Sequence, residues 1–132
     1  MSDHNPSGMR TPLARVRHLG AARSGTRHFW HQRLTSVALI PLTVALIVVV
    51  FSLLGRNHAA VVQILGSSPV AIGMLLFVLV SVYHMWLGMQ AIIEDYVHEE
   101  LPKYAALMCN TFFSCAVGLT AVFATLKLSF GF

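Results

Sequence analysis

The run VAIGMLLFVLVSVYHMWLGMQAIIEDY, residues 70–96, joins a long uncharged apolar stretch to two carboxylates, with one histidine inside the stretch. Its uncharged part, residues 70–93, is long enough to cross a bilayer, because a helix needs roughly 20 apolar residues to span a core of about 30 Å. Along a helix, eleven residues make three turns plus roughly 20°, so Asp95 lies almost above His84, about 16 Å further along the axis. The run therefore predicts a spanning helix that carries both groups on one face.

Two further apolar runs, residues 34–54 and 104–126, flank this one. The 132-residue chain is 56% hydrophobic and only 11% charged, whereas a soluble domain carries about 25% charged residues. We therefore expect an all-α integral membrane protein with three transmembrane helices and no separate soluble domain. In the third run small residues recur at helical spacing, which favours close helix packing: Ser114, Gly118, Ala121 and Thr125.

Basic residues are concentrated before the first apolar run. Six of the nine Lys and Arg residues lie there: Arg10, Arg15, Arg17, Arg23, Arg27 and Arg33. This asymmetry predicts a cytoplasmic N-terminus, and it indicates a charged lipid surface rather than a nucleic acid as partner. Residues 1–24 are expected to form a flexible basic cytoplasmic tail, and residues 25–132 a three-helix transmembrane anchor domain. Residues 25–33 alternate cationic and aromatic side chains, as in an interfacial belt that meets headgroups or an anionic ligand.

His84 is the one histidine that falls away from a predicted membrane edge. A neutral imidazole in hydrocarbon has a donor and an acceptor to satisfy, so it faces protein, water or a metal. A hydrogen bond between helices and a ligand role fit the sequence equally. If His84 is a metal ligand, haem iron is the natural metal, because imidazole is a good ligand for iron. Gly88 lies one turn further along the helix and leaves room for the face of a porphyrin. A bis-histidine haem needs its second ligand from a partner chain.

Asp95 and Tyr96 stand where the second run meets water. Tyrosines and acidic residues are common at that position without a further function. Together they also place a phenol donor beside a carboxylate, which suits a quinone whose oxygens need hydrogen bonds and protons during reduction. The pair is therefore a candidate quinone site at the membrane edge.

Seven residues of this region go beyond a generic span in identity and spacing: His84, Trp86, Gly88, Met89, Asp95, Tyr96 and Val97. They resemble the signature of the hydrophobic membrane anchor subunit of succinate dehydrogenase, respiratory complex II. The resemblance covers roughly residues 25–128 and includes the three spans, the cytoplasmic N-terminus and an arginine, Arg33, just before the first span. It implies that His84 is an axial ligand of a haem b shared with the cytochrome b subunit. It also implies that Tyr96 hydrogen-bonds ubiquinone, with Asp95 close by.

The resemblance further implies that Arg33 meets a haem propionate. Relatives carry a histidine shortly before that arginine. In this sequence a gapless match falls on Arg27, with His28 one position away, so both residues are candidates for the second propionate contact.

The implied function is that of an anchor for the flavoprotein and iron–sulfur subunits at the bacterial cytoplasmic (inner) membrane. Such a subunit serves the tricarboxylic acid cycle and aerobic electron transport. The chain has no flavin or iron–sulfur motif of its own, so most redox centres belong to its partners. One alternative is the anchor of a related quinol:fumarate reductase. Another is a small transport or scaffold protein in which His84 and Asp95 form a proton relay or hold helices together.

Overall fold

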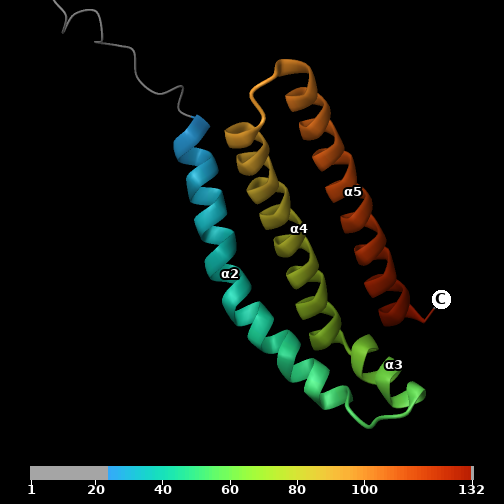
Figure 1. Cartoon of the computed structure of the whole chain (residues 1–132). Helices are drawn as coiled ribbons and strands as arrows, with labels where there is room; N and C mark the ends of the chain where they lie inside the picture. The colour runs from blue at the N-terminus through green and yellow to red at the C-terminus, as the bar shows by residue number, and fades with distance from the viewer. Residues whose placement is uncertain (1–23, 132) are drawn as a thin grey trace, which may run out of the picture.

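The computed structural model describes residues 24–131, and within that range the chain forms four helices joined by short connections. These helices are α2 (Ser24–Leu53), α3 (His58–Gly66), α4 (Ser68–Tyr96) and α5 (Glu100–Phe130). Helix α4 runs between α2 and α5, and the short α3 lies at the end where α2 connects to α4 (Figure 1). The all-α fold predicted from the sequence is confirmed.

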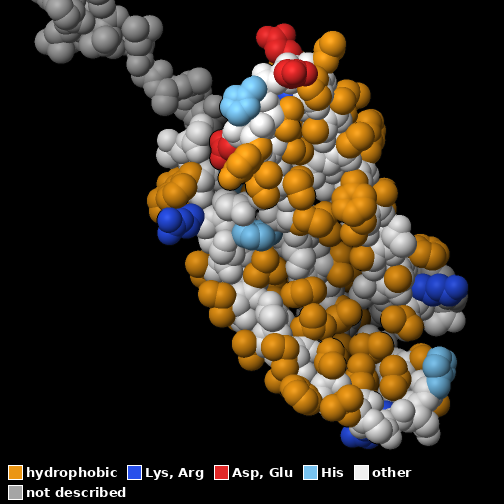
Figure 2. Space-filling view, in the orientation of Figure 1, with side chains coloured by type: hydrophobic (Ala, Val, Ile, Leu, Met, Phe, Trp, Pro, Cys, Tyr) orange, Lys and Arg blue, Asp and Glu red, His pale blue; other side chains and the backbone are white. Residues whose placement is uncertain are grey.

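Three of the helices are long and apolar enough to cross a membrane: Gly25–Leu53, Ser68–Tyr96 and Glu100–Phe130. Each extends beyond the apolar run that predicts it, because polar side chains near a helix end reach headgroups and water without ending the helix. Large apolar side chains cover the face seen in Figure 2, and most charged side chains on it gather toward the two ends. The protein is therefore a multi-pass membrane protein with three spanning helices.

The connection between the first two spans contains α3, whereas the sequence predicts a loop over residues 55–69. Helix α3 begins after Asn57, whose side chain accepts a hydrogen bond from the Ala60 N–H at 2.9 Å, and this cap stabilises the first turn. The sequence predicts Ser67 or Ser68 as the cap of the next helix, and Ser67 is the N-cap residue of α4. Its hydroxyl makes no cap hydrogen bond and donates to the Ile64 carbonyl oxygen at 2.6 Å. A proline at the first turn of α4 provides its start signal.

Gly66 allows α3 to pack against the end of α5, since a Cβ there would lie 2.9 Å from the Leu128 carbonyl oxygen. We expect Gly66→Ala to lower the Tm of the purified protein in detergent, because the clash with backbone costs about 1–3 kcal/mol. Gly73→Ala is the matched control, since a Cβ at Gly73 meets nothing within 4 Å. Equal Tm values for the two variants would contradict the close α3–α5 contact.

Helix α2 bends along its length (Figure 1), and Pro41 lies inside it. Proline lacks an N–H and its ring clashes with the carbonyl four residues earlier, so it is expected to kink the helix. The side-chain hydrogen bonds that join α2 to α4 come from residues 28–35, before this proline. The polar contacts of the two helices are therefore confined to the N-terminal part of α2.

Small residues of α5 pack against α4, as the third apolar run predicts. Ser114 and Thr125 are buried, with exposed fractions of 3% and 7%, and a Cβ at Gly118 would lie 3.3 Å from the Val82 side chain. Asn110 adds a hydrogen bond from its amide to the Trp86 carbonyl oxygen at 3.1 Å. Close approach of backbones and interhelical hydrogen bonds are the usual means of holding helices together in lipid.

Candidate functional site

His84 is partly buried in the face of α4 that meets α2. Its Nδ1 lies 2.9 Å from the Thr35 Oγ1, and its Nε2 lies 3.4 Å from the Gln32 Nε2. Both partners belong to α2 and are three residues apart, so the imidazole lies between two polar side chains of the neighbouring helix. From the sequence, His84 could form a hydrogen bond between helices or bind a ligand. The structure shows the interhelical hydrogen bond.

Thr35 determines which nitrogen of His84 carries the proton. The Thr35 hydroxyl oxygen lies 2.8 Å from the His31 carbonyl oxygen and 3.0 Å from that of Gln32, so its single proton is donated to backbone. Toward His84 the hydroxyl offers a lone pair, and the Nδ1–H of the imidazole is the donor. The Nε2 of the neutral ring therefore keeps a lone pair that faces the Gln32 amide.

Gln32 lies beside the small residue that follows His84 by one turn. A Cβ at Gly88 would stand 3.3 Å from the Gln32 Nε2, so the amide occupies space that the glycine leaves open. The Gln32 Oε1 is buried and has no hydrogen-bond partner within the described residues. Because an unpaired buried acceptor costs about 1–3 kcal/mol, the polar cluster around His84 is incomplete in this chain alone.

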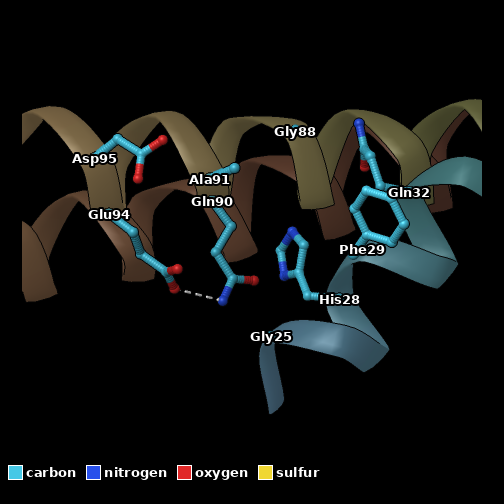
Figure 3. Close-up of a pocket in the computed structure, with 9 residues that line it drawn as sticks. All are labelled: Gly25, His28, Phe29, Gln32, Gly88, Gln90, Ala91, Glu94 and Asp95. Atoms are coloured by element: carbon cyan, nitrogen blue, oxygen red, sulfur yellow. Dashed lines mark hydrogen bonds between the residues drawn. The ribbon is translucent and has the colours of Figure 1, made fainter. Parts of the chain in front are cut away.

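A pocket of about 750 Å³ opens next to this cluster, between the beginning of α2 and the end of α4. Its polar lining residues are His28, Gln32, Gln90, Glu94 and Asp95. Figure 3 shows the two acidic side chains at one end of the pocket and Gln32 at the other, with His28 between them. Gln90 donates to the Glu94 carboxylate at 2.8 Å. The volume is in the range of small-molecule sites, and the lining offers carboxylate, imidazole and amide groups.

Several residues singled out from the sequence meet at this cleft. Gly88, Asp95 and His28 line the pocket, and His84 adjoins it through Gln32. The His28 Nε2–H donates to the Leu87 carbonyl oxygen at 3.2 Å, which holds that ring against α4. The common face of His84 and Asp95 predicted from helical spacing is consistent with this placement.

Three other candidates lie elsewhere. Tyr96 is the last residue of α4 and is 79% exposed. Arg33 is exposed, with its guanidinium carbon 4.8 Å from the centroid of the Phe29 ring. Arg27 lines a second pocket, together with Tyr83 and other residues. Within this chain these three side chains do not converge with His84.

Gln32 and Thr35 were missed in the sequence as partners of His84. The signal that points to them is periodic: polar side chains on α2 recur at i, i+3, i+4 and i+7, which places them on one stripe of a spanning helix. The stripe consists of His28, His31, Gln32 and Thr35. Intramembrane polar residues on one face indicate a polar partner on the next helix.

A second set of contacts joins the three spans on another side of α4. His31 Nδ1 lies 2.6 Å from the Tyr83 hydroxyl oxygen, and the Tyr83 and Trp86 rings stack with centroids 5.9 Å apart. Trp86 donates from its Nε1–H to the Thr111 Oγ1 of α5 at 3.2 Å. Tyr83 and Trp86 lie about 100° and 160° around α4 from His84, so this set is separate from the histidine cluster.

No group of three or more His, Cys, Asp or Glu side chains is placed to hold a metal ion among residues 24–131. A single imidazole with one nitrogen hydrogen-bonded and the other carrying a lone pair is a different arrangement. It is suited to act as one axial ligand of a haem iron whose other ligand comes from elsewhere.

Comparison with known proteins gives consistent matches. A family model described as succinate dehydrogenase/fumarate reductase transmembrane subunit matches residues 7–125. The chain is 31% identical over 121 residues to the succinate dehydrogenase hydrophobic membrane anchor subunit of Paracoccus denitrificans, covering 92% of this chain and 93% of the relative. It is 33% identical over 90 residues to the subunit of the same description from Rickettsia bellii (strain RML369-C), covering 67% and 70%. No solved structure matches the chain significantly.

Proposed function

The chain belongs to the succinate dehydrogenase/fumarate reductase transmembrane subunit family and is a membrane anchor subunit of succinate dehydrogenase, and on this premise we propose that it contributes one axial ligand of a haem b and part of a ubiquinone site. In this proposal the haem is shared with the cytochrome b subunit, and the flavoprotein and iron–sulfur subunits dock at the cytoplasmic face. The complex serves the tricarboxylic acid cycle and aerobic electron transport in the bacterial inner membrane. The arginines before α2 favour a cytoplasmic N-terminus.

The observation that carries the haem part is the pair of contacts between His84 and α2, from Nδ1 to the Thr35 hydroxyl and from Nε2 to the Gln32 amide. The hydrogen bond to Thr35 keeps the proton on Nδ1, and the Nε2 lone pair is the group that binds iron. Histidine ligands of metals usually donate their second N–H to an oxygen in this way, which fixes the tautomer and the ring orientation. When bound, the haem supplies one-electron redox chemistry, and the residues of this chain hold and orient it.

The surroundings of His84 also fit such a group. Gly88 presents no side chain, and the Gln32 amide meets the Nε2 through a long contact of 3.4 Å while its own Oε1 lacks a partner. Displacing this amide therefore sacrifices one weak hydrogen bond and allows the orphaned oxygen to find a donor. The cluster is better satisfied with a ligand than without one.

Basic residues near the beginning of α2 supply the propionate contacts in this proposal. His28 lines the same pocket as Gly88 and Gln32. It is therefore the residue of the α2–α4 cleft that we assign to a haem propionate. Arg33 lies on the exposed side of α2, where it is available to a propionate of a haem held against a partner subunit. Arg27 lines the second pocket, which also includes His28 in its lining, so Arg27 is the alternative candidate for the second propionate contact.

Asp95 and Tyr96 form this chain's part of the ubiquinone site. Asp95 lines the pocket at the end of α4, and Tyr96, the last residue of that helix, is exposed and accessible to a partner or ligand there. The phenol donates a hydrogen bond to a quinone oxygen that gains charge on reduction, and the carboxylate passes on a proton. Lys103 donates to the Glu94 carbonyl oxygen at 3.1 Å and steadies this end of the helix.

The shared-haem proposal is tested by expressing the chain with and without a partner. Because His84 supplies one axial nitrogen and a bis-histidine haem needs two, the purified chain is expected to be haem-free when made alone. It should acquire haem when co-expressed with a second membrane subunit that carries its own intramembrane histidine. The measurement is the haem-to-protein ratio from absorbance, and a stoichiometric haem in the isolated chain would refute the shared pocket.

A further inference from the structure

The side chain of Gln32 lies between His84 and the cleft that α2 and α4 form. It stands at the end of the cleft opposite the two acidic side chains (Figure 3), and its amide nitrogen is 3.4 Å from the His84 Nε2. The same nitrogen would be 3.3 Å from a Cβ at Gly88. The amide therefore covers the Nε2 lone pair and fills the space beside it that a metal ion bound to this nitrogen needs.

The Gln32 amide is poorly satisfied in this position. Its distance of 3.4 Å from the His84 Nε2 is long for a hydrogen bond, so the contact is weak. Its Oε1 is buried and has no hydrogen-bond partner among residues 24–131, which is unfavourable for a buried acceptor. Because atoms of this chain enclose the oxygen, a donor from outside can reach it only if the side chain turns.

The cleft offers the side chain a second position. Gln32 already lines this volume of about 750 Å³, and rotation about its side-chain torsions moves the amide without moving α2. Inside the cleft the NH₂ group and the Oε1 can both hydrogen-bond to water or to polar side chains. Burial of the side-chain methylene groups favours the position observed, whereas satisfaction of the amide favours the cleft, so neither position is locked.

We propose that Gln32 is the gate residue of the haem-ligand site. In its closed position, the one observed, the amide covers the His84 Nε2. In its open position the amide lies in the cleft and the Nε2 is free to bind iron. A ligand that binds only one of two positions shifts the population toward it, so haem binding opens the gate. The inference rests on the proposed haem role of His84, and it adds that Gln32 controls how fast the site is filled.

The test uses the complex of this chain with the cytochrome b subunit, purified without haem from haem-depleted cells. Diethyl pyrocarbonate modifies imidazole nitrogens that carry a lone pair, and mass spectrometry of peptides measures how fast it modifies His84. His58, which is exposed on α3, is the internal reference. Stopped-flow absorbance then follows the uptake of added haemin, and transfer to apomyoglobin measures its release. The modification assay reports on the gate without any bound haem.

Two substitutions of Gln32 are expected to act in opposite directions. Gln32→Ala removes the amide, so modification of His84 and uptake of haemin should be about two- to tenfold faster, the factor that corresponds to one weak hydrogen bond. Release of haem should keep its wild-type rate, because the open amide does not contact His84. Gln32→Leu fills the same space without an unpaired oxygen, and its apolar side chain does not favour the polar cleft. Both rates should therefore fall about fivefold, since the unpaired oxygen costs more than the weak hydrogen bond contributes.

Gln90→Ala is the matched control. Gln90 is a second glutamine of the same cleft, but its amide donates to Glu94 and not to His84, so both rates should stay at the wild-type value. If haemin protects His84 from modification and the Gln32 variants modify and load at the wild-type rate, the gate is wrong and the haem proposal stands. Faster release in Gln32→Ala with unchanged uptake would make Gln32 a haem contact and would also overturn the gate. If haemin does not protect His84 in the wild type, the haem proposal fails and the gate with it.

Discussion

Replacing His84 with alanine is expected to abolish or shift the haem b absorbance of the assembled complex, because an axial nitrogen is lost. In the proposal the Nε2 of His84 would bind the iron, and the next residue on the same face of α4 is Gly88, which offers no ligand. The measurement is the reduced-minus-oxidised spectrum and the haem content of the purified complex. If the His84→Ala complex keeps its full haem content and an unshifted spectrum, His84 is not a haem ligand and its role is limited to interhelical hydrogen bonds.

Thr35 provides a finer test of the same idea. Thr35→Val removes the acceptor of the His84 Nδ1–H while keeping the shape of the side chain. Loss of such a supporting partner typically weakens metal binding about 10- to 100-fold, so haem should dissociate more readily and its spectrum should shift. Thr35→Ser keeps the hydroxyl and should restore both properties. Thr43→Val is the matched control on α2, because Thr43 is exposed and lies two turns further along. A role limited to packing would make valine and serine behave alike.

The three spans and the common face of His84 and Asp95 could be predicted from the sequence because both depend on local quantities, the length of an apolar run and the period of a helix. The stacking of Arg33 on Phe29 is also local, since residues four apart lie on one side of a helix. The resemblance assigns Arg33 to a haem propionate, and the contact with Phe29 leaves the arginine side chain exposed for that role.

The partners of His84 depend on a different kind of information. Gln32 and Thr35 are about fifty residues away in the chain, and their contact with the imidazole requires the register of α2 against α4. No single run encodes that register, although the polar stripe on α2 indicates which face turns inward. Helix α3 was missed for a related reason: its nine residues are too short to form a stable helix alone, and packing of Gly66 on α5 stabilises it.

The exposure of Tyr96 indicates that this chain alone does not form the complete quinone site. The residue was expected at a quinone site together with Asp95, yet only Asp95 lines the pocket, while Tyr96 is 79% exposed. A phenol at the end of a spanning helix with so much accessible surface is positioned for a ligand held between subunits. The quinone proposal therefore requires a partner surface over this end of α4.

Tyr96→Phe is expected to lower succinate-to-ubiquinone turnover on the order of 10- to 1000-fold, because it removes a hydrogen bond to an oxygen that gains negative charge in the reaction. Reduction of a soluble artificial acceptor, which takes electrons before they reach the membrane site, should be unchanged. The haem spectrum should also persist, since Tyr96 lies twelve residues from His84, about 18 Å along the helix. Asp95→Asn should resemble Tyr96→Phe if the carboxylate delivers protons.

Tyr104→Phe is the matched control for this experiment. Tyr104 is an exposed phenol near the beginning of α5, at the same membrane edge as Tyr96, so its loss reports on interfacial anchoring without the proposed quinone contact. Membranes carrying each variant are assayed in parallel for ubiquinone reduction and for soluble-acceptor reduction. A selective loss of ubiquinone reduction in Tyr96→Phe, absent in Tyr104→Phe, supports the site. Equal loss of both activities in Tyr96→Phe, or loss of neither, would remove Tyr96 from the quinone site.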